Sequence, residues 1–204
     1  ERERGVEGVK SAAPLVRSRV MANASEAKTG LEVFGISPED LATIPRVADP
    51  ETALGALADF PRGIAIGSGV ARELNVGLGD KVRLILPNGN KTAFGTTPRI
   101  NAYEVVYIFT TGRFHSDQIR AYLPFEEAQS FFIRDGRADE IEVMVEDPER
   151  IEDYSLALLN AAGERSLVWT WQDSQSGFLR TLDVEDNVMF IILSILVLIS
   201  DINI

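Results

Sequence analysis

The chain has 204 residues and a formal net charge of −11, with 45% hydrophobic and 25% charged residues. This balance is typical of a globular protein with a sizeable core and excludes a disordered chain. The surplus of acidic residues repels phosphate groups and argues against a nucleic-acid partner. Because there is no cysteine, neither a disulfide nor thiolate chemistry is available.

Apolar periodicity in the first part of the chain predicts strands joined by short helices. The elements expected in chain order are strands over 15–22 and 30–36, a short helix from Pro38 capped by Ser37, mixed helix and loop signals over 47–60, a strand over 63–67 and a helix over 68–76. Gly77 and Gly79 end that last helix, because glycine is favoured just beyond helix C-termini.

The rest of the chain continues the alternation of strands and helices. The expected elements are strands over 81–86, 104–110 and 121–123, a helix over 124–132, a strand over 139–145, a helix over 150–162, a strand over 166–171 and a long helix from 176 onward. This order predicts an α+β fold with mixed sheets and helices.

Residues 87–103 form the longest segment without a regular period. The segment contains two prolines and two glycines and joins the strands predicted over 81–86 and 104–110. Connections of this length inside a compact domain are usually functional or disordered. We therefore expect residues 87–103 to protrude from the sheet as an irregular or two-stranded arm.

The C-terminal part has its own apolar character. Residues 188–199 read VMFIILSILVLI, with one serine as the only polar residue. Twelve residues fit a buried core helix, whereas a membrane span needs roughly 20. A transmembrane helix cut short by the end of the chain explains both the run and its terminal place. The acidic flank over 183–186 then lies outside the cytoplasm.

Candidate catalytic residues do not form a coherent set. His115, the single histidine, has Asp117 nearby but no second histidine or cysteine to complete a metal site, and we expect it to be a surface turn residue. Gly67 and Gly69 mimic a phosphate-binding loop, but Arg72 stands where the dinucleotide fingerprint needs its third glycine. We therefore predict a tight strand-to-helix turn there, no cofactor, no metal and no enzymatic activity.

Several stretches are similar to one family of permeases. GIAIG at 63–67 and ARELNVGLGDKV at 71–82 are similar to a block found in the wider macrolide-exporter-like permease superfamily. Three further stretches narrow the similarity from this superfamily to one type of permease; they are residues 86–105, 108–129 and 171–193. Together the stretches resemble the periplasmic domain of lipoprotein-releasing ABC transporter permeases of the LolC/LolE type.

The resemblance implies a domain organisation. It implies a Porter-like subdomain over 1–59 and 135–175, and a Sabre-like subdomain over 60–134 that contains a protruding hairpin, the hook, at 87–103. Residues 176–204 would be a helix leading into a truncated second transmembrane segment. The protein would lie in the bacterial inner membrane with this domain on the periplasmic side. One departure is Asp201, because a carboxylate is costly inside a membrane.

The resemblance also implies partners and a docking site. The partners would be a periplasmic lipoprotein carrier of the LolA type, a second permease subunit, a cytoplasmic ATPase of the LolD type and the lipoprotein cargo. In the family the hook docks on the carrier, and a small polar patch at its base, the pad, assists. The corresponding residues here are Phe94, Gly95, Pro98, Arg99, Asn101 and Arg83. The pad is incomplete, because Ile100 and Asn101 stand where the family has a glutamine and an arginine.

Two other interpretations remain open at this point. One is a related permease with another cargo, such as a macrolide-type exporter or a cell-division permease. Those relatives lack a long insertion at 91–101, so this segment distinguishes them. The other is a soluble enzyme, which a pocket of converging titratable groups would support.

Overall fold

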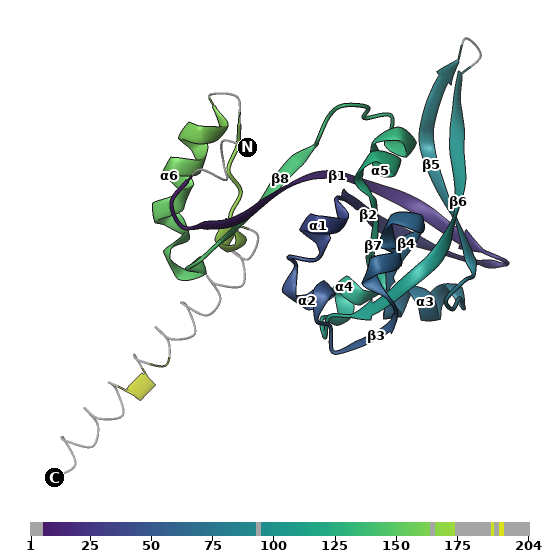
Figure 1. Cartoon of the computed structure of the whole chain (residues 1–204), viewed down its shortest axis with the longest axis horizontal. Helices are drawn as coiled ribbons and strands as arrows, with labels where there is room; N and C mark the ends of the chain where they lie inside the picture. Colours follow the sequence, from purple (N-terminus) through teal and green to yellow (C-terminus); the bar gives the residue numbers. More distant parts are fainter. Residues whose placement is uncertain (1–5, 93–94, 164–165, 174–188, 190–191, 194–204) are drawn as a thin grey trace. The chain divides into compact units, whose positions relative to one another are not determined.

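The computed structural model describes residues 6–92, 95–163, 166–173, 189 and 192–193 (Figure 1). The chain divides into two compact units. The larger unit comprises Val9–Met144, and the smaller unit combines the residues from Val145 onward with the segment that ends at Gly8.

The larger unit is built around one mixed sheet, which confirms the predicted α+β class. The strands are β1 (Val9–Ala24), β2 (Ala27–Ile36), β3 (Thr52–Gly55), β4 (Ile64–Gly67), β5 (Lys81–Thr92), β6 (Gly95–Thr110), β7 (Arg120–Pro124) and β8 (Glu140–Val145). Their order is β2-β7-β4-β6-β5-β1-β8, with β3 paired to β6. Because β1 also pairs with β2, six of the strands form a closed ring of hydrogen-bonded neighbours.

Helices cover both faces of this sheet. They are α1 (Pro38–Leu41), α2 (Pro45–Ala48), η2 (Leu57–Arg62), α3 (Ser68–Leu74), α4 (Phe114–Ile119) and α5 (Phe125–Phe132). One hydrophobic cluster joins the sheet to α3 and α5. A second cluster joins the opposite face to α1, α2 and η2. The alternation of side chains along each strand supplies both clusters, since neighbouring residues point to opposite faces.

Gly67 and Gly69, which resemble a phosphate-binding loop in the sequence, lie in the turn from β4 into α3, where the chain passes close to the backbone of Asp117. A Cβ on Gly67 would lie 2.3 Å from the carbonyl oxygen of Asp117, and one on Gly69 would lie 2.8 Å from the same atom. Asp117 is buried at the start of α4, where its Oδ1 accepts hydrogen bonds from the backbone N–H and the hydroxyl of Thr111 at 2.9 and 2.7 Å. The glycines therefore allow two backbones to approach closely.

The predicted arm is a two-stranded extension of β5 and β6. The strands pair from Lys81↔Glu104 to Leu86↔Arg99, then shift register and pair again from Asn90↔Thr97 to Thr92↔Gly95. Figure 1 shows both strands continuing well beyond the helices of the larger unit. The structure thus confirms the protruding arm. Of the two predicted forms, irregular or two-stranded, the arm is two-stranded with regular pairing.

The smaller unit contains η3 (Pro148–Arg150) and α6 (Ile151–Ala162), with Val145 and Leu158 buried. The backbone N–H of Glu146 donates to the carbonyl of Gly8 at 2.9 Å. The strand predicted over 166–171 is wrong, because residues 166–170 have no regular structure and a helical turn follows at 171–173.

The observed units have other boundaries than the subdomains implied by the resemblance. The sheet joins strands from residues 1–59 and from 60–134 through continuous pairing, and the division between units falls after Met144. The assignment of Porter-like and Sabre-like subdomains therefore stays a prediction. The helix predicted from 176 onward lies outside the described residues apart from Met189, Ile192 and Leu193. Within the described part, no helix is long and apolar enough to cross a membrane.

Gly67→Ala tests the close approach at the β4–α3 turn. The added methyl group would press on a backbone carbonyl that cannot rotate away, so we expect the free energy of unfolding to fall by about 1–3 kcal/mol. Gly30→Ala is the matched control, because a Cβ there meets nothing within 4 Å. Thermal unfolding of both variants measures the difference, and equal stabilities would contradict this role of Gly67.

Candidate functional site

The base of the hairpin has two faces that carry different side chains. Residues directly opposite one another on antiparallel strands point to the same face. Leu84 pairs with Asn101 and Leu86 with Arg99, so these side chains share the face that packs on α5; we call it the inner face. Arg83 pairs with Ala102, on the other side, which we call the outer face.

On the inner face, a hydrogen-bonded chain ties the hairpin to α5. The Asn101 Nδ2 donates to the Tyr103 hydroxyl at 3.2 Å, and that hydroxyl donates to Glu127 Oε1 at 2.9 Å. The Tyr103 ring also meets Phe131 edge to face, with 6.0 Å between ring centroids. Burial raises the pKa of Tyr103 above its ordinary value, so the phenol stays protonated and remains a donor.

The outer face continues from the hairpin onto β1. In the register of β1 with β5, Met21 lies opposite Ile85 and Asn23 lies opposite Arg83. Ile100 in turn lies opposite Ile85 on β6. Arg83 is exposed, and so are Met21 and Ile100, at 45% and 55%.

The residues predicted to form the pad are therefore divided between the faces. Arg83 lies on the outer face, whereas Arg99 and Asn101 lie on the inner face. Asn101 is already hydrogen-bonded within the protein. The outer face instead brings Arg83 together with Ile100. Counting strand alternation back from the hairpin could have separated these residues, but only with the register known.

The described residues of the hook tip are exposed. Gly95 has φ +127°, in the region that favours glycine, and lies opposite Thr92 where the two strands meet. Pro98 is exposed on β6. Phe94, the predicted anchor, lies outside the described residues. The structure thus presents Gly95 and Pro98 to solvent, and their docking role stays a prediction.

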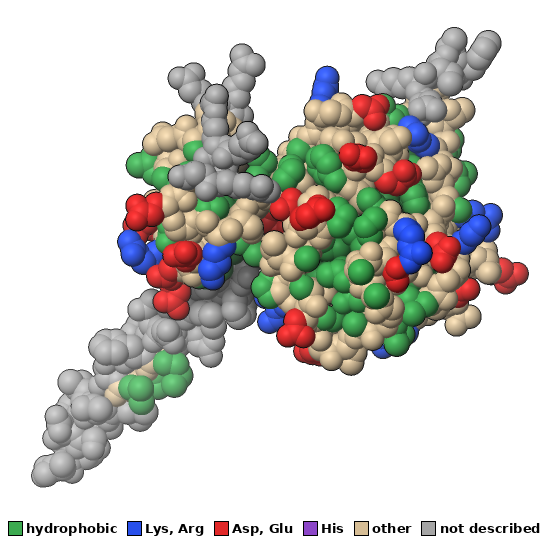
Figure 2. Space-filling model, in the orientation of Figure 1, with side chains coloured by type: hydrophobic (Ala, Val, Ile, Leu, Met, Phe, Trp, Pro, Cys, Tyr) green, Lys and Arg blue, Asp and Glu red, His purple; other side chains and the backbone are tan. Residues whose placement is uncertain are grey.

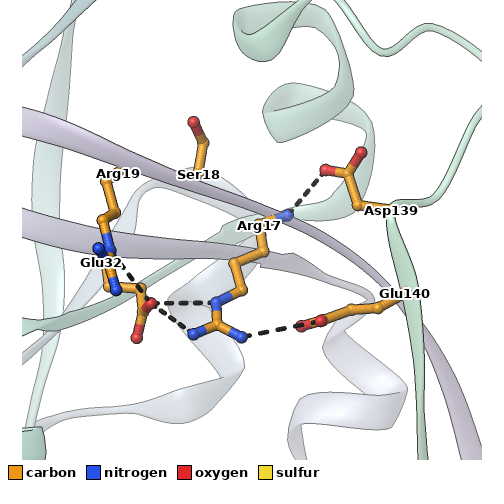
Figure 3. Close-up of a pocket in the computed structure, with 6 residues that line it drawn as sticks. All are labelled: Arg17, Ser18, Arg19, Glu32, Asp139 and Glu140. Carbon is orange, nitrogen blue, oxygen red and sulfur yellow. Dashed lines mark hydrogen bonds and ion pairs between the residues drawn. The ribbon is translucent and has the colours of Figure 1, made fainter. Parts of the chain in front are cut away.

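A hollow of about 440 Å³ is lined by residues of β1, β2 and the start of β8 and contains the ion pairs of Arg17 (Figure 3). The Arg17 guanidinium donates to Glu32 Oε1 from Nε and Nη2 at 3.0 and 2.6 Å, and lies 3.7 Å from Glu140. This hydrogen bond to Glu32 raises the pKa of Arg17. Asp139 accepts from the Arg17 backbone N–H at 3.1 Å. The charges compensate one another and fasten β1 to β2 and β8.

The remaining candidate chemistry stays dispersed. His115 is exposed in the first turn of α4, so it is a surface residue as expected, but in a helix and not in a turn. Among the described residues, no three acidic, histidine or cysteine side chains lie close enough together to hold a metal ion. Figure 2 shows acidic and basic side chains scattered over the visible face, with hydrophobic side chains between them.

A comparison with known sequences finds related proteins over most of the chain. Residues 1–160 match the family model described as "MacB-like periplasmic core domain". The chain is 29% identical over 202 residues to the "Lipoprotein-releasing system transmembrane protein LolC" of Neisseria meningitidis serogroup B, covering 96% of this chain and 48% of that protein. It is 24% identical to LolE of Haemophilus influenzae over 143 residues, covering 70% of this chain and 34% of LolE. The chain spans about half the length of the LolC relative and a third of LolE.

Solved structures of transporter domains are also similar. The extracellular domain of the noncanonic ABC-type transporter YknZ from Gram-positive bacteria aligns with a TM-score of 0.47 and 17% identity, covering 75% of this chain and 74% of that one. The periplasmic region of MacB from Actinobacillus actinomycetemcomitans aligns with a TM-score of 0.46 and 14% identity, covering 74% and 65%.

The bond between Tyr103 and Glu127 should stabilise the attachment of the hairpin to α5. Tyr103→Phe removes the hydroxyl and keeps the ring, so we expect the free energy of unfolding to fall by about 0.5–1.5 kcal/mol. Glu127→Gln and the double variant complete a double-mutant cycle measured by urea unfolding. A coupling energy of zero would show that the two side chains do not interact in solution.

Proposed function

Because the chain belongs to the family of MacB-like periplasmic core domains, we propose that it is the periplasmic domain of an inner-membrane ABC transporter permease that releases outer-membrane lipoproteins. In this proposal the domain hands the lipoproteins to a soluble periplasmic carrier of the LolA type. The observation that carries it is the protruding hairpin of β5 and β6, in a chain similar to LolC along 96% of its length.

The proposal assigns the chain a binding role. A projecting hairpin supplies a surface that a soluble partner reaches without contacting the rest of the domain. ATP hydrolysis belongs to a separate cytoplasmic subunit of the LolD type, and a second permease subunit completes the complex. The charged groups of β1, β2 and β8 in the hollow of Figure 3 are engaged with one another, as in the Arg17–Glu32 pair, and are not arranged as an acid, a base and a nucleophile.

Within the hairpin, we assign Phe94 as the anchor that enters an apolar cavity of the carrier. Aromatic side chains commonly provide a large share of the binding energy of an interface. Gly95 and Pro98, both exposed, shape the backbone around it. Arg83, which is exposed at the base, contributes a charge-assisted contact.

Phe94→Ala tests the assignment by carrier binding. We expect the dissociation constant for a purified LolA-type carrier to rise at least about tenfold, or about 1.4 kcal/mol, with the melting temperature unchanged. Phe114→Ala is the control, because Phe114 is an exposed phenylalanine on α4, 71% accessible, and lies outside the hairpin. Unchanged carrier binding by Phe94→Ala, or a large loss of thermal stability, would refute the anchor.

A permease that exports another cargo is the second candidate. The similarity to the MacB family covers both possibilities, and the hairpin favours the lipoprotein system. A wild-type chain that binds no lipoprotein carrier at micromolar concentrations would support the second candidate and overturn the first.

A further inference from the structure

A second hollow, of about 330 Å³, lies at the edge of β1 where its pairing with β5 ends. Three arginines line it, Arg17 and Arg19 from β1 and Arg134 from the segment after α5. No carboxylate is among the described residues of this lining, because the carboxylates that pair with Arg17 line the hollow of Figure 3 instead. We call the second hollow the arginine pocket. Its lining is a local reversal of charge in a chain of net charge −11.

The arginine pocket exists because the ladder between β1 and β5 is short. The two strands pair only over Met21–Asn23, and the same register would put Arg19 opposite Pro87, which has no N–H to donate. The backbone N–H of Arg17 donates to Asp139 at this edge of β1. Since N–H groups alternate between the two edges of a strand, the N–H of Arg19 points to the same edge, beyond the end of the ladder with β5.

Two of the three arginines keep donor groups for a ligand. Arg134 Nε donates to Asp139 at 3.0 Å, and Arg19 Nε lies 3.7 Å from Glu32. Within the described part of the chain, their side chains form no other hydrogen bond or ion pair, so the terminal nitrogens of both guanidiniums remain available. Both side chains are exposed and can turn toward a ligand. Arg17, which Glu32 holds in place, adds a fixed positive charge.

The rest of the lining combines neutral polar groups with an apolar wall. The Ser18 hydroxyl and the Asn88 side-chain amide have no hydrogen-bond partner among the residues that the structure describes. Leu86, Pro87 and Phe132 form the apolar side, and two of them, Leu86 and Phe132, belong to the hydrophobic cluster beneath α5. Small-molecule sites usually have volumes of about 300–1,000 Å³. The arginine pocket therefore has room for a charged group together with a small organic part that carries it.

We propose that the arginine pocket binds the phosphate group of an organic phosphate ester. One guanidinium fork already satisfies a planar carboxylate, whereas the several oxygens of a phosphate suit the three guanidiniums of this lining. The backbone N–H of Arg19, Ser18 and Asn88 supply further donors, and the apolar wall contacts the organic part. The ligand is either a soluble phosphate ester or the headgroup of a phospholipid. None of the six residues assigned to carrier docking lines the pocket, so this inference is independent of the docking site.

The test is a calorimetric titration of the full 204-residue chain, in a non-ionic detergent, with glycerol 3-phosphate. Asn88→Asp places a carboxylate in the pocket with almost no change of shape. Because like charges repel, we expect its dissociation constant to rise at least about tenfold. The melting temperature should not change, since Asn88 is exposed. Asn160→Asp is the matched control, because Asn160 is exposed on α6 and gains the same charge outside the pocket.

A second pair of variants removes positive charge instead of adding negative charge. Arg19→Gln combined with Arg134→Gln should weaken the binding of glycerol 3-phosphate at least about tenfold, because it removes the two guanidiniums with available donors. Arg62→Gln combined with Arg72→Gln is the control, because both arginines are exposed and lie outside the pocket. A wild-type chain that does not bind glycerol 3-phosphate at millimolar concentrations would overturn the proposal. Equal affinities of the wild type and Asn88→Asp, or equal losses in the variants and their controls, would also overturn it.

Two further ligands identify the source and the chemistry of the anion. Dihexanoyl phosphatidylglycerol carries a glycerol phosphate on short acyl chains. If it binds at least about tenfold more tightly than glycerol 3-phosphate, and Asn88→Asp removes that binding, the site is supported and its ligand is a phospholipid headgroup. If it binds equally or more weakly while glycerol 3-phosphate binds as expected, the site is supported and its ligand is a soluble ester. Acetate that binds as tightly as glycerol 3-phosphate would refute the assignment to phosphate.

Discussion

The larger unit depends on the pairing of β1 with strands on both of its sides. β1 is sixteen residues long and pairs with β2 over Val16–Ala24 and with β5 over Met21–Asn23. These pairings close the ring of strands, so each of its six members has a partner on both sides. Since unpaired backbone groups are costly when buried, closure allows the short strands β4 and β7 to lie in the core.

The same pairing gives the hairpin a firm base. β5 is held between β1 and β6 at its start, and the ladder with β6 is interrupted between Leu86 and Asn90 before it resumes toward the tip. The inner face is fixed to α5 by Tyr103 and Glu127, while the outer face has no such cover. The paired strands β5 and β6 thus have one face that packs on the domain and one face that is exposed. Because side chains alternate between the faces, the position of each residue along its strand determines on which face it lies.

Much of the fold could be predicted from single elements. The strands over 30–36 and 63–67 follow from their apolar runs, because nearly all of their residues are buried. The strand over 139–145 and the helix from 150 also follow from periodicity, although only Val145 and Leu158 are buried in them. β3 was missed because all four of its side chains are exposed at the sheet edge and leave no apolar pattern. The strand predicted over 166–171 alternates like a strand, but residues 166–170 have no regular structure and residues 171–173 are helical.

The candidate site was harder to predict than the elements that support it. The hairpin was placed correctly from its length and its prolines and glycines, but the composition of each face was not. Arg83 and Asn101 were both assigned to the pad, but the register of β5 with β6 puts them on opposite faces of the hairpin. The neighbourhood of Met21, Ile85 and Ile100 on the outer face needs two registers at once, that of β1 with β5 and that of β5 with β6. No local pattern in the sequence records which strand becomes the neighbour of β1.

Closure of the ring also sets the order in which the chain can fold. β2 pairs in parallel with β7, and the partners Glu32 and Arg120 are 88 positions apart in the sequence. The first two strands can form a hairpin by themselves, but the edge of β2 that receives β7 waits until most of the unit has been synthesised. Contacts so distant in sequence make folding slow. During that interval a strand edge destined for the core is available to other chains, and the nascent domain needs protection from aggregation.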